Sequence, residues 1–225
     1  MDNITGRTEE PGTGDALADA RNRYLRRIAV YRSFGYDRPA AVQCAVDRLG
    51  AFEGPVLDVG TGQGLLAVEL ARRGCEVVSI DVSADEQQVG VVNARYEGVS
   101  HRITFLALDA RHTGFGDGSF GTIATLDALH HLADGPATFS EMRRLLRPGG
   151  TLLLAELTAE GFALVARVHA TEGRVHPVGE VTVASAVEWF TANGFQLTGL
   201  EEEHLHTTAV LTRTQESVDP RSRRP

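Results

Sequence analysis

The chain is 225 residues long, carries a formal net charge of −8 at pH 7, and is 42% hydrophobic and 23% charged. This length accommodates one large domain with little left for a second, and the acidic charge argues against a general nucleic-acid surface. Two cysteines, Cys44 and Cys75, make neither a disulfide framework nor a metal site. There is no apolar run of about 18 residues and no secretory signal, so we expect a cytoplasmic protein without a membrane partner.

Apolar runs and helical patterns alternate over the first two thirds of the chain. After a leader at 1–14, expected to be disordered, we predict helices at 15–32, 39–49, 65–73, 83–97 and 136–146. Short apolar strands are predicted at 56–59, 76–80, 103–108, 120–126 and 151–157. The alternation predicts an α/β fold with a doubly wound, mostly parallel sheet and helices on both faces.

The pattern changes after residue 157. Residues 158–180 are apolar at first and then rich in His, Gly and Pro, and we predict no regular element there. A helix follows at 183–193 with Thr182 as its N-cap. Two strands at 195–201 and 204–212, joined at Glu202-Glu203, predict an antiparallel hairpin. We therefore expect one domain, with its parts assigned as a helical lid at 15–50, a ligand-binding core at 52–157, a substrate-side segment and hairpin at 158–213, and a flexible tail at 214–225.

The stretch between the first predicted strand and its helix is rich in glycine. Residues 56–64 read VLDVGTGQG, an apolar run that breaks into three alternating glycines. Glycine lets a ligand approach the backbone, and the helix start adds unpaired N–H groups and a partial positive charge. Such a turn can also be a plain connection in an α/β sheet. Because the loop has no Lys or Arg and no Walker pattern, a polyphosphate ligand is disfavoured.

Acidic residues stand at the ends of successive predicted strands. They are Asp58, Asp81, Asp109, Asp127 after Leu126, and Glu156. In an open α/β sheet, ligands bind outside the carboxyl ends of the strands. Each acid alone could be a helix cap, but the series suits a ligand with a cationic amine, a ribose diol and an adenine amine.

The pattern Asp58-x-Gly60-x-Gly62-x-Gly64 resembles motif I of the class I S-adenosylmethionine-dependent methyltransferases. Residues 79–83, 108–110, 120–132 and 145–150 resemble the later motifs of that family in the same order, so that the resemblance covers about 52–157. One departure is Phe120-Gly121, where the family usually has Phe-Asp. The resemblance implies a Rossmann-like sheet with an antiparallel C-terminal edge hairpin, S-adenosyl-L-methionine as cofactor, and methyl transfer to a small molecule.

The resemblance also implies the cofactor-binding residues. Asp81 would hold the ribose hydroxyls, and Asp109 would face the adenine amine. The full expected set is Asp58, Gly60, Thr61, Gly62, Gly64, Asp81, Val82, Asp109, Ala110 and Leu126.

Histidines supply the candidates for catalysis, because imidazole titrates near neutrality. His130 at the exit of the fourth strand is the candidate general base, with a helix-capping or supporting role as the alternative. The residues expected to contact substrate are Tyr24, Tyr31, His131, Glu156, His169 and His176. A metal site from His169, His176 and Glu156 matches no zinc spacing, so we expect none.

Two other functions are open at this point. A chain with this fold could be a binding module that has lost its chemistry but keeps the cofactor. A nicotinamide-dependent oxidoreductase is the less favoured alternative, because its fingerprint is G-x-G-x-x-G. The expected partner is a small-molecule substrate, with neither nucleic acid nor a membrane, and a homodimer is possible.

Overall fold

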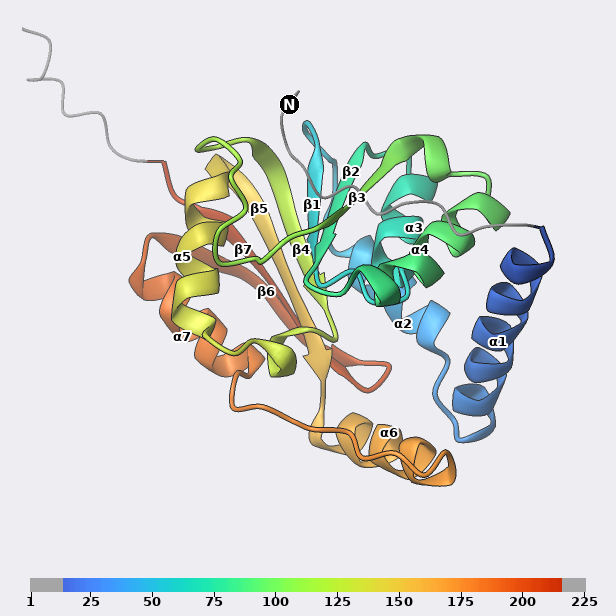
Figure 1. Cartoon of the computed structure of the whole chain (residues 1–225). Coiled ribbons are helices and arrows are strands. Elements are labelled where there is room, and N and C mark those ends of the chain that lie inside the picture. Colours follow the sequence, from blue (N-terminus) through green and yellow to red (C-terminus); the bar gives the residue numbers. More distant parts are fainter. Residues whose placement is uncertain (1–13, 216–225) are drawn as a thin grey trace, which may run out of the picture.

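The computed structural model describes residues 14–215 and contains one seven-stranded sheet in the order β3-β2-β1-β4-β5-β7-β6 (Figure 1). The strands are β1 (Val56–Val59), β2 (Val77–Asp81), β3 (Ile103–Ala107), β4 (Phe120–Leu126), β5 (Leu146–Leu157), β6 (Phe195–Glu203) and β7 (His206–Arg213). The first five pair in parallel, and β7 pairs antiparallel with both β5 and β6. The predicted fold class is confirmed, including the inverted edge hairpin.

Helices cover both faces of the sheet. They are α1 (Gly14–Ser33), α2 (Arg38–Asp47), α3 (Leu65–Arg72), α4 (Ala84–Tyr96), α5 (Gly135–Leu145), α6 (Ala159–Thr171) and α7 (Val183–Ala192), with short 3₁₀ turns η1 (Ser100–Arg102) and η2 (Leu129–His131). The apolar sides of α2, α3 and α4 pack on one face. Those of α5 and α7 pack on the other. The central strand β4 is buried along its whole length, as expected of a parallel strand covered on both sides.

The glycine-rich stretch forms the tight loop between β1 and α3. Gly64 is the N-cap of α3 with a φ of 77°, a conformation that favours glycine. A Cβ on Gly64 would lie 2.6 Å from the Cα of Gly90 in α4. The glycine therefore allows α3 and α4 to approach closely beneath the loop, and this contact fixes where the helix start points.

A third apolar cluster lies at the carboxyl ends of the strands, where α1 and α6 meet. It contains Tyr31 from α1, Tyr36 before α2, and Val165 and Val168 from α6, with Leu157 at the end of β5. In Figure 1, α6 lies directly beyond the arrowhead of β5. The two helices thus lie over the ligand-binding edge of the sheet.

Three expectations about the elements were wrong. Residues 159–171 form α6, where no element was predicted: Thr158 caps it by accepting a hydrogen bond from the Gly161 N–H at 3.2 Å. The hairpin turn lies at His204 and Leu205, with φ angles of 51° and 66°, whereas Glu202 and Glu203 are the last residues of β6. Strand β5 begins at Leu146 because the chain pairs with Phe120 across an irregularity in the register. The caps Ser83 and Thr182 are confirmed, since each accepts a hydrogen bond from the backbone three residues later.

None of the helices within 14–215 is long and apolar enough to cross a membrane. The expected leader and most of the expected tail lie outside the described residues.

Candidate functional site

A cavity of about 610 Å³ opens at the carboxyl ends of β1, β2 and β4. One end is formed by the loops after the strands, with Gly60, Gly62, Asp81, Val82, Asp109 and Ala110 in its wall. The other end is formed by the helices above the sheet and by η2, with Arg27, Tyr31, Arg38, His130, His131, His169, Arg174 and His176. The cavity therefore joins the predicted cofactor residues to most of the predicted substrate residues.

The loop end is held by Asp81. Its carboxylate accepts hydrogen bonds from the N–H of Gly62 and the N–H of Ser83, each at 2.9 Å. The side chain is thereby fixed at the cavity wall, with carboxylate lone pairs still available to hydroxyl groups of a ligand. At Gly62 no atom lies within 4 Å of the position that a Cβ would take, so the backbone is open to close approach.

Asp109 lies farther along the same wall and is half exposed. Arg111 donates to both of its carboxylate oxygens, at 2.6 to 3.1 Å. This side-chain hydrogen bonding, with that from the Arg111 N–H, lowers the pKa of Asp109 to about 2. The carboxylate is ionised at neutral pH and can accept from an amine.

A buried polar chain supports the loop from behind. The Gln87 amide donates to the Thr61 hydroxyl at 2.9 Å, Thr61 bonds Ser79 at 2.6 Å, and Ser79 donates to Asp58 at 2.7 Å. Asp58 is fully buried. Burial, with a smaller contribution from the charge of Asp81, raises the pKa of Asp58 to about 7 against the hydrogen bond from Ser79.

Several of the expected binding residues do not line the cavity. Asp58, Thr61 and Gly64 lie behind the loop, and Leu126 packs in the core beneath it. Tyr24 does not line the cavity either: its ring packs on Arg21, which bonds Asn93 of α4 and Glu97 at the end of that helix. These side chains shape or support the site but do not face the cavity.

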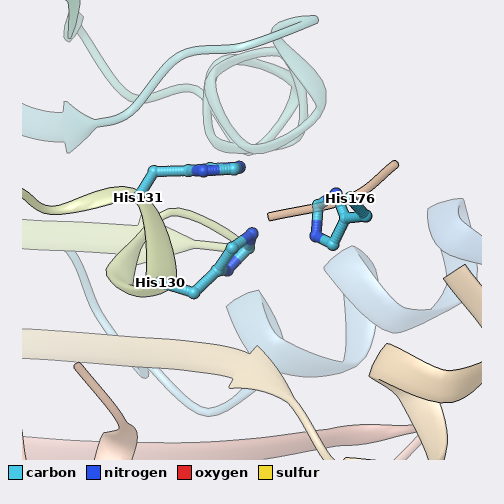
Figure 2. Close-up of side chains that lie close together, drawn as sticks. All are labelled: His130, His131 and His176. Atoms are coloured by element: carbon cyan, nitrogen blue, oxygen red, sulfur yellow. The ribbon is translucent and has the colours of Figure 1, made fainter. Parts of the chain in front are cut away.

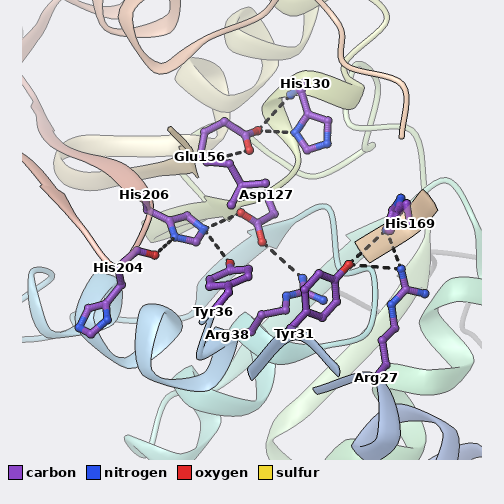
Figure 3. Close-up of polar contacts among 11 residues, drawn as sticks. Arg27, Tyr31, Tyr36, Arg38, Asp127, His130, Glu156, His169, His204 and His206 are labelled. Carbon is purple, nitrogen blue, oxygen red and sulfur yellow. Dashed lines mark hydrogen bonds and ion pairs between the residues drawn. The ribbon is translucent and has the colours of Figure 1, made fainter. Parts of the chain in front are cut away.

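Glu156 also lies behind the wall, where it orients His130. Its Oε2 accepts from the backbone N–H of His130 at 3.1 Å and lies 2.7 Å from His130 Nδ1 (Figure 3). Both side chains are at most 4% exposed. Since a carboxylate only accepts, Nδ1 carries the hydrogen, and in the neutral ring the lone pair is then at Nε2. Nε2 is buried and has no hydrogen-bond partner among the described residues. This lone pair can take a proton from an acceptor group or bind a metal ion.

Four of the eight histidines of the chain gather at this end. The ring of His130 lies 3.9 Å from that of His131 and 4.9 Å from that of His176, between centroids (Figure 2). His169 lies 4.8 Å from His176. Burial and the neighbouring imidazoles together lower the pKa of His176 to about 4. Burial also lowers the pKa of His131 and of His169, so these three rings favour the neutral form, which offers lone pairs or N–H groups.

A glycine fixes the segment that carries His176 over the sheet. The N–H of Gly179 donates to the carbonyl oxygen of His130 at 2.9 Å. A Cβ at Gly179 would lie 2.5 Å from that oxygen, so only glycine fits so closely. The contact joins the 174–182 segment to η2.

Asp127 links the sheet to the helices above it. Its carboxylate lies 2.6 Å from His206 Nε2 and accepts from Arg38 at 3.3 Å (Figure 3). His206 Nδ1 lies 3.0 Å from the carbonyl oxygen of His204, so both of its nitrogens face acceptors and His206 is an imidazolium. Burial raises the pKa of Asp127, but the charges of His206 and Arg38 outweigh it and hold the pKa at about 2. His204 itself lies in the turn of the hairpin and does not line the cavity.

Arg27 and Arg38 were not expected in the site, because arginines between the apolar positions of a helix usually face solvent. Arg27 donates to His169 Nε2 at 2.9 Å, and Tyr31 lies 3.1 Å from the same nitrogen. Arg38 lies over the ring of Tyr31 at 5.1 Å. The packing of α1 against α6 turns Arg27 to the cavity, and contacts with Tyr31 and Asp127 turn Arg38 there from the start of α2.

Comparison with known proteins shows the family and agrees with the fold. A family model described as "Methyltransferase domain" matches residues 57–154. A ubiquinone biosynthesis O-methyltransferase of Xanthomonas euvesicatoria is 30% identical over 195 residues, covering 81% of this chain and 80% of the relative. The methyltransferase GfsG of Streptomyces halstedii is 32% identical over 154 residues, which are 68% of this chain and 49% of that protein.

The chain spans about half the length of the first two curated relatives it matches. The fold is also shared with a geranyl diphosphate C-methyltransferase of Streptomyces coelicolor, solved with S-adenosyl-L-homocysteine. That similarity has a TM-score of 0.62 at 15% identity and covers 78% of this chain and 76% of that one.

Proposed function

The chain belongs to the class I S-adenosylmethionine-dependent methyltransferases, and on this premise we propose that it methylates a hydroxyl group of a small molecule. The observation that carries the proposal is the single cavity that joins the glycine loop and Asp81 to the histidine-lined end. An O-methyltransferase among the relatives supports oxygen as the acceptor atom.

The residues at the loop end fit the cofactor of this family. Gly62 leaves the backbone open, Asp81 offers carboxylate lone pairs suited to a ribose diol, and Asp109 offers an ionised acceptor for an adenine amine. We propose that Gly60, Gly62, Asp81, Val82, Asp109 and Ala110 hold S-adenosylmethionine, with Asp58, Thr61, Gly64 and Leu126 supporting the loop.

Bound S-adenosylmethionine supplies an activated methyl group on a sulfonium, so the protein's task is to place an acceptor in line with it. We propose that the acceptor lies against His130 and His131, under the helices that contribute Tyr31 and His169. Transfer would form the bond from oxygen to the methyl carbon, break the bond from that carbon to sulfur, and release the hydroxyl proton. His130, oriented by Glu156, would take that proton at Nε2.

The arginines give the acceptor end a positive character within an acidic protein. Arg27 contacts two neutral groups, Tyr31 and His169, so its charge is not balanced by them. We therefore expect acceptors with an electron-rich or anionic oxygen to bind better than cationic ones.

Calorimetric titration with S-adenosylmethionine and S-adenosylhomocysteine, with NAD as control, tests the cofactor part of the proposal. We expect micromolar dissociation constants (roughly −8 kcal/mol) for the first two and no binding of NAD. A panel of phenols and hydroxylated polyketides, read out as S-adenosylhomocysteine formed, then tests the acceptor. Binding without turnover on any acceptor would favour the cofactor-binding module instead.

A further inference from the structure

Three histidines converge in the cavity in an arrangement typical of metal ligands. Ring nitrogens of His130, His131 and His176 all lie within 4.8 Å of one another (Figure 2). The first two come from η2 after β4, and the third comes from the segment after α6, which Gly179 ties to the carbonyl oxygen of His130. No contiguous spacing in the sequence could have predicted this group, because its members are separated by 45 residues of chain.

Two of these imidazoles present buried nitrogens that have no hydrogen-bond partner in the described part of the chain. They are His130 Nε2 and His176 Nε2. Leaving a buried polar atom unpaired costs about 1–3 kcal/mol, so two unpaired nitrogens in a cluster whose ring nitrogens lie within 4.8 Å of one another indicate a missing ligand. For His130 the available atom must be a lone pair, because the Nδ1 hydrogen is directed at Glu156.

We infer that His130, His131 and His176 bind a divalent late first-row metal ion, of which zinc is the type. Neutral imidazole suits zinc, copper and nickel and does not suit magnesium or calcium, which prefer oxygen. The Glu156–His130 pair has the carboxylate–histidine arrangement that orients metal ligands in proteins. Three protein ligands leave one position of a tetrahedron open, as in catalytic zinc sites.

The geometry needs only a small contraction. Ligand nitrogens at about 2.0–2.1 Å from a tetrahedral metal are roughly 3.3 Å apart. His131 is exposed and His176 lies outside regular structure, so side-chain rotation can supply this movement while His130 stays fixed by Glu156.

His169 contacts the same cluster but is not a ligand. An arginine can only donate, so Arg27 assigns the lone pair of His169 to Nε2 and the hydrogen to Nδ1. Its Nε2 is already occupied, and its Nδ1–H, which is buried without a partner, would oppose a metal ion. The site therefore consists of the three other histidines.

The role of the metal rests on the proposed function. Its open position faces the cavity that also holds the cofactor residues, so it would hold the acceptor hydroxyl through oxygen and lower the pKa of that hydroxyl. The proton then leaves to water, and His130 acts through the metal. A lone pair on His130 Nε2 cannot serve as a direct base and as a ligand at once, which makes the two roles separable by experiment.

The test is cobalt binding to the full chain, with any affinity tag removed and the protein first treated with a chelator. Cobalt(II) reports tetrahedral nitrogen ligation through its visible absorption. We expect one equivalent to bind, zinc to displace it, and excess magnesium to leave the spectrum unchanged. Glu156→Gln removes a residue that orients a ligand and should weaken cobalt binding by roughly 10–100-fold. His176→Gln and His131→Gln each remove a ligand and should weaken it by more than that.

The controls use histidines of the same chain. His101→Gln removes an exposed imidazole from η1 and should leave the spectrum and affinity unchanged, and His169→Gln should keep tetrahedral absorption. No absorption in the wild type, or equal binding by the His176, His131 and His101 variants, would overturn the metal site and return His130 to the role of direct base. The affinity for S-adenosylmethionine is measured in parallel. If the wild type does not bind S-adenosylmethionine, the proposed function is refuted. The cobalt titration tests the metal site independently of that result.

Discussion

Asp81 should decide how tightly the chain binds its cofactor. The carboxylate lies in the cavity wall and accepts the N–H groups of Gly62 and Ser83 at 2.9 Å. Two ribose hydroxyls donating to an ionised acceptor contribute roughly 1.5–3 kcal/mol each. Asp81→Ala removes these bonds and also frees the loop. We therefore expect the dissociation constant of S-adenosylmethionine to rise at least about tenfold, which is 1.4 kcal/mol.

Asp81→Asn separates the two effects. The amide oxygen can still accept one N–H, so the loop should stay in place while the charge is lost, and the affinity should fall between wild type and Asp81→Ala. Asp85→Asn is the matched control, because Asp85 is an exposed carboxylate in the first turn of α4 and does not line the cavity. Calorimetry measures all four proteins at one salt concentration. Unchanged affinity in Asp81→Ala would refute the assignment of Asp81 to the ribose and move the cofactor elsewhere in the cavity.

Three further changes test other parts of the structure. The pKa of Asp58 rises from 3.8 to about 7 on folding, so between these pH values the folded protein binds a proton that the unfolded chain does not bind, and its stability falls as pH rises. The melting temperature of Asp58→Asn should therefore increase relative to that of wild type from pH 5 to 8. A difference that does not depend on pH would contradict this. Burial lowers the pKa of His206, but Asp127 raises it more, so the net shift is upward. In thermal melts, the stability of wild type relative to His206→Gln should be greatest below about pH 6.5 and should decrease as pH rises above it. Gly179→Ala should displace the His176 segment and abolish cobalt absorption while S-adenosylmethionine affinity stays within about twofold; retained absorption would show that the Gly179 contact does not position the ligand.

The sheet and most helices were predictable because their signals are local. Each parallel strand is a short apolar run, and caps such as Ser83 and Thr182 mark helix starts. Helix α6 was missed because glycine, β-branched residues and His dilute its pattern; its stability comes from packing on Tyr31 and the end of β5. The hairpin turn was misplaced because His204 and Leu205 are unusual in left-handed positions, where Asn and Gly would have been the signal.

The two ends of the cavity also differ in how far the sequence could predict them. The loop end is built from consecutive residues, with Gly62 and Asp81 close to their strands, and the sequence motif predicted both. At the other end, Arg27 of α1, Arg38 of α2 and His176 after α6 meet only when these elements pack together. The two arginines were not predicted, because their residue type favoured solvent exposure. His176 was predicted to contact substrate, but its place beside His130 and His131 was not predicted.

This division has a consequence for how the acceptor is chosen. The loop end uses backbone groups and two carboxylates, which leave little freedom for change, whereas the other end consists of side chains carried by α1, α2, η2, α6 and the segment after α6. Substitutions at Arg27 or His176 can therefore alter the acceptor while the hydrogen bonds that hold the glycine loop, such as Gly62 N–H to Asp81, stay in place. Burying several imidazoles beside an arginine costs free energy, and an acceptor that needs only an apolar surface would not require them. The structure thus favours an acceptor with oxygen atoms close together, one to approach the histidines and another to meet the charge of Arg27.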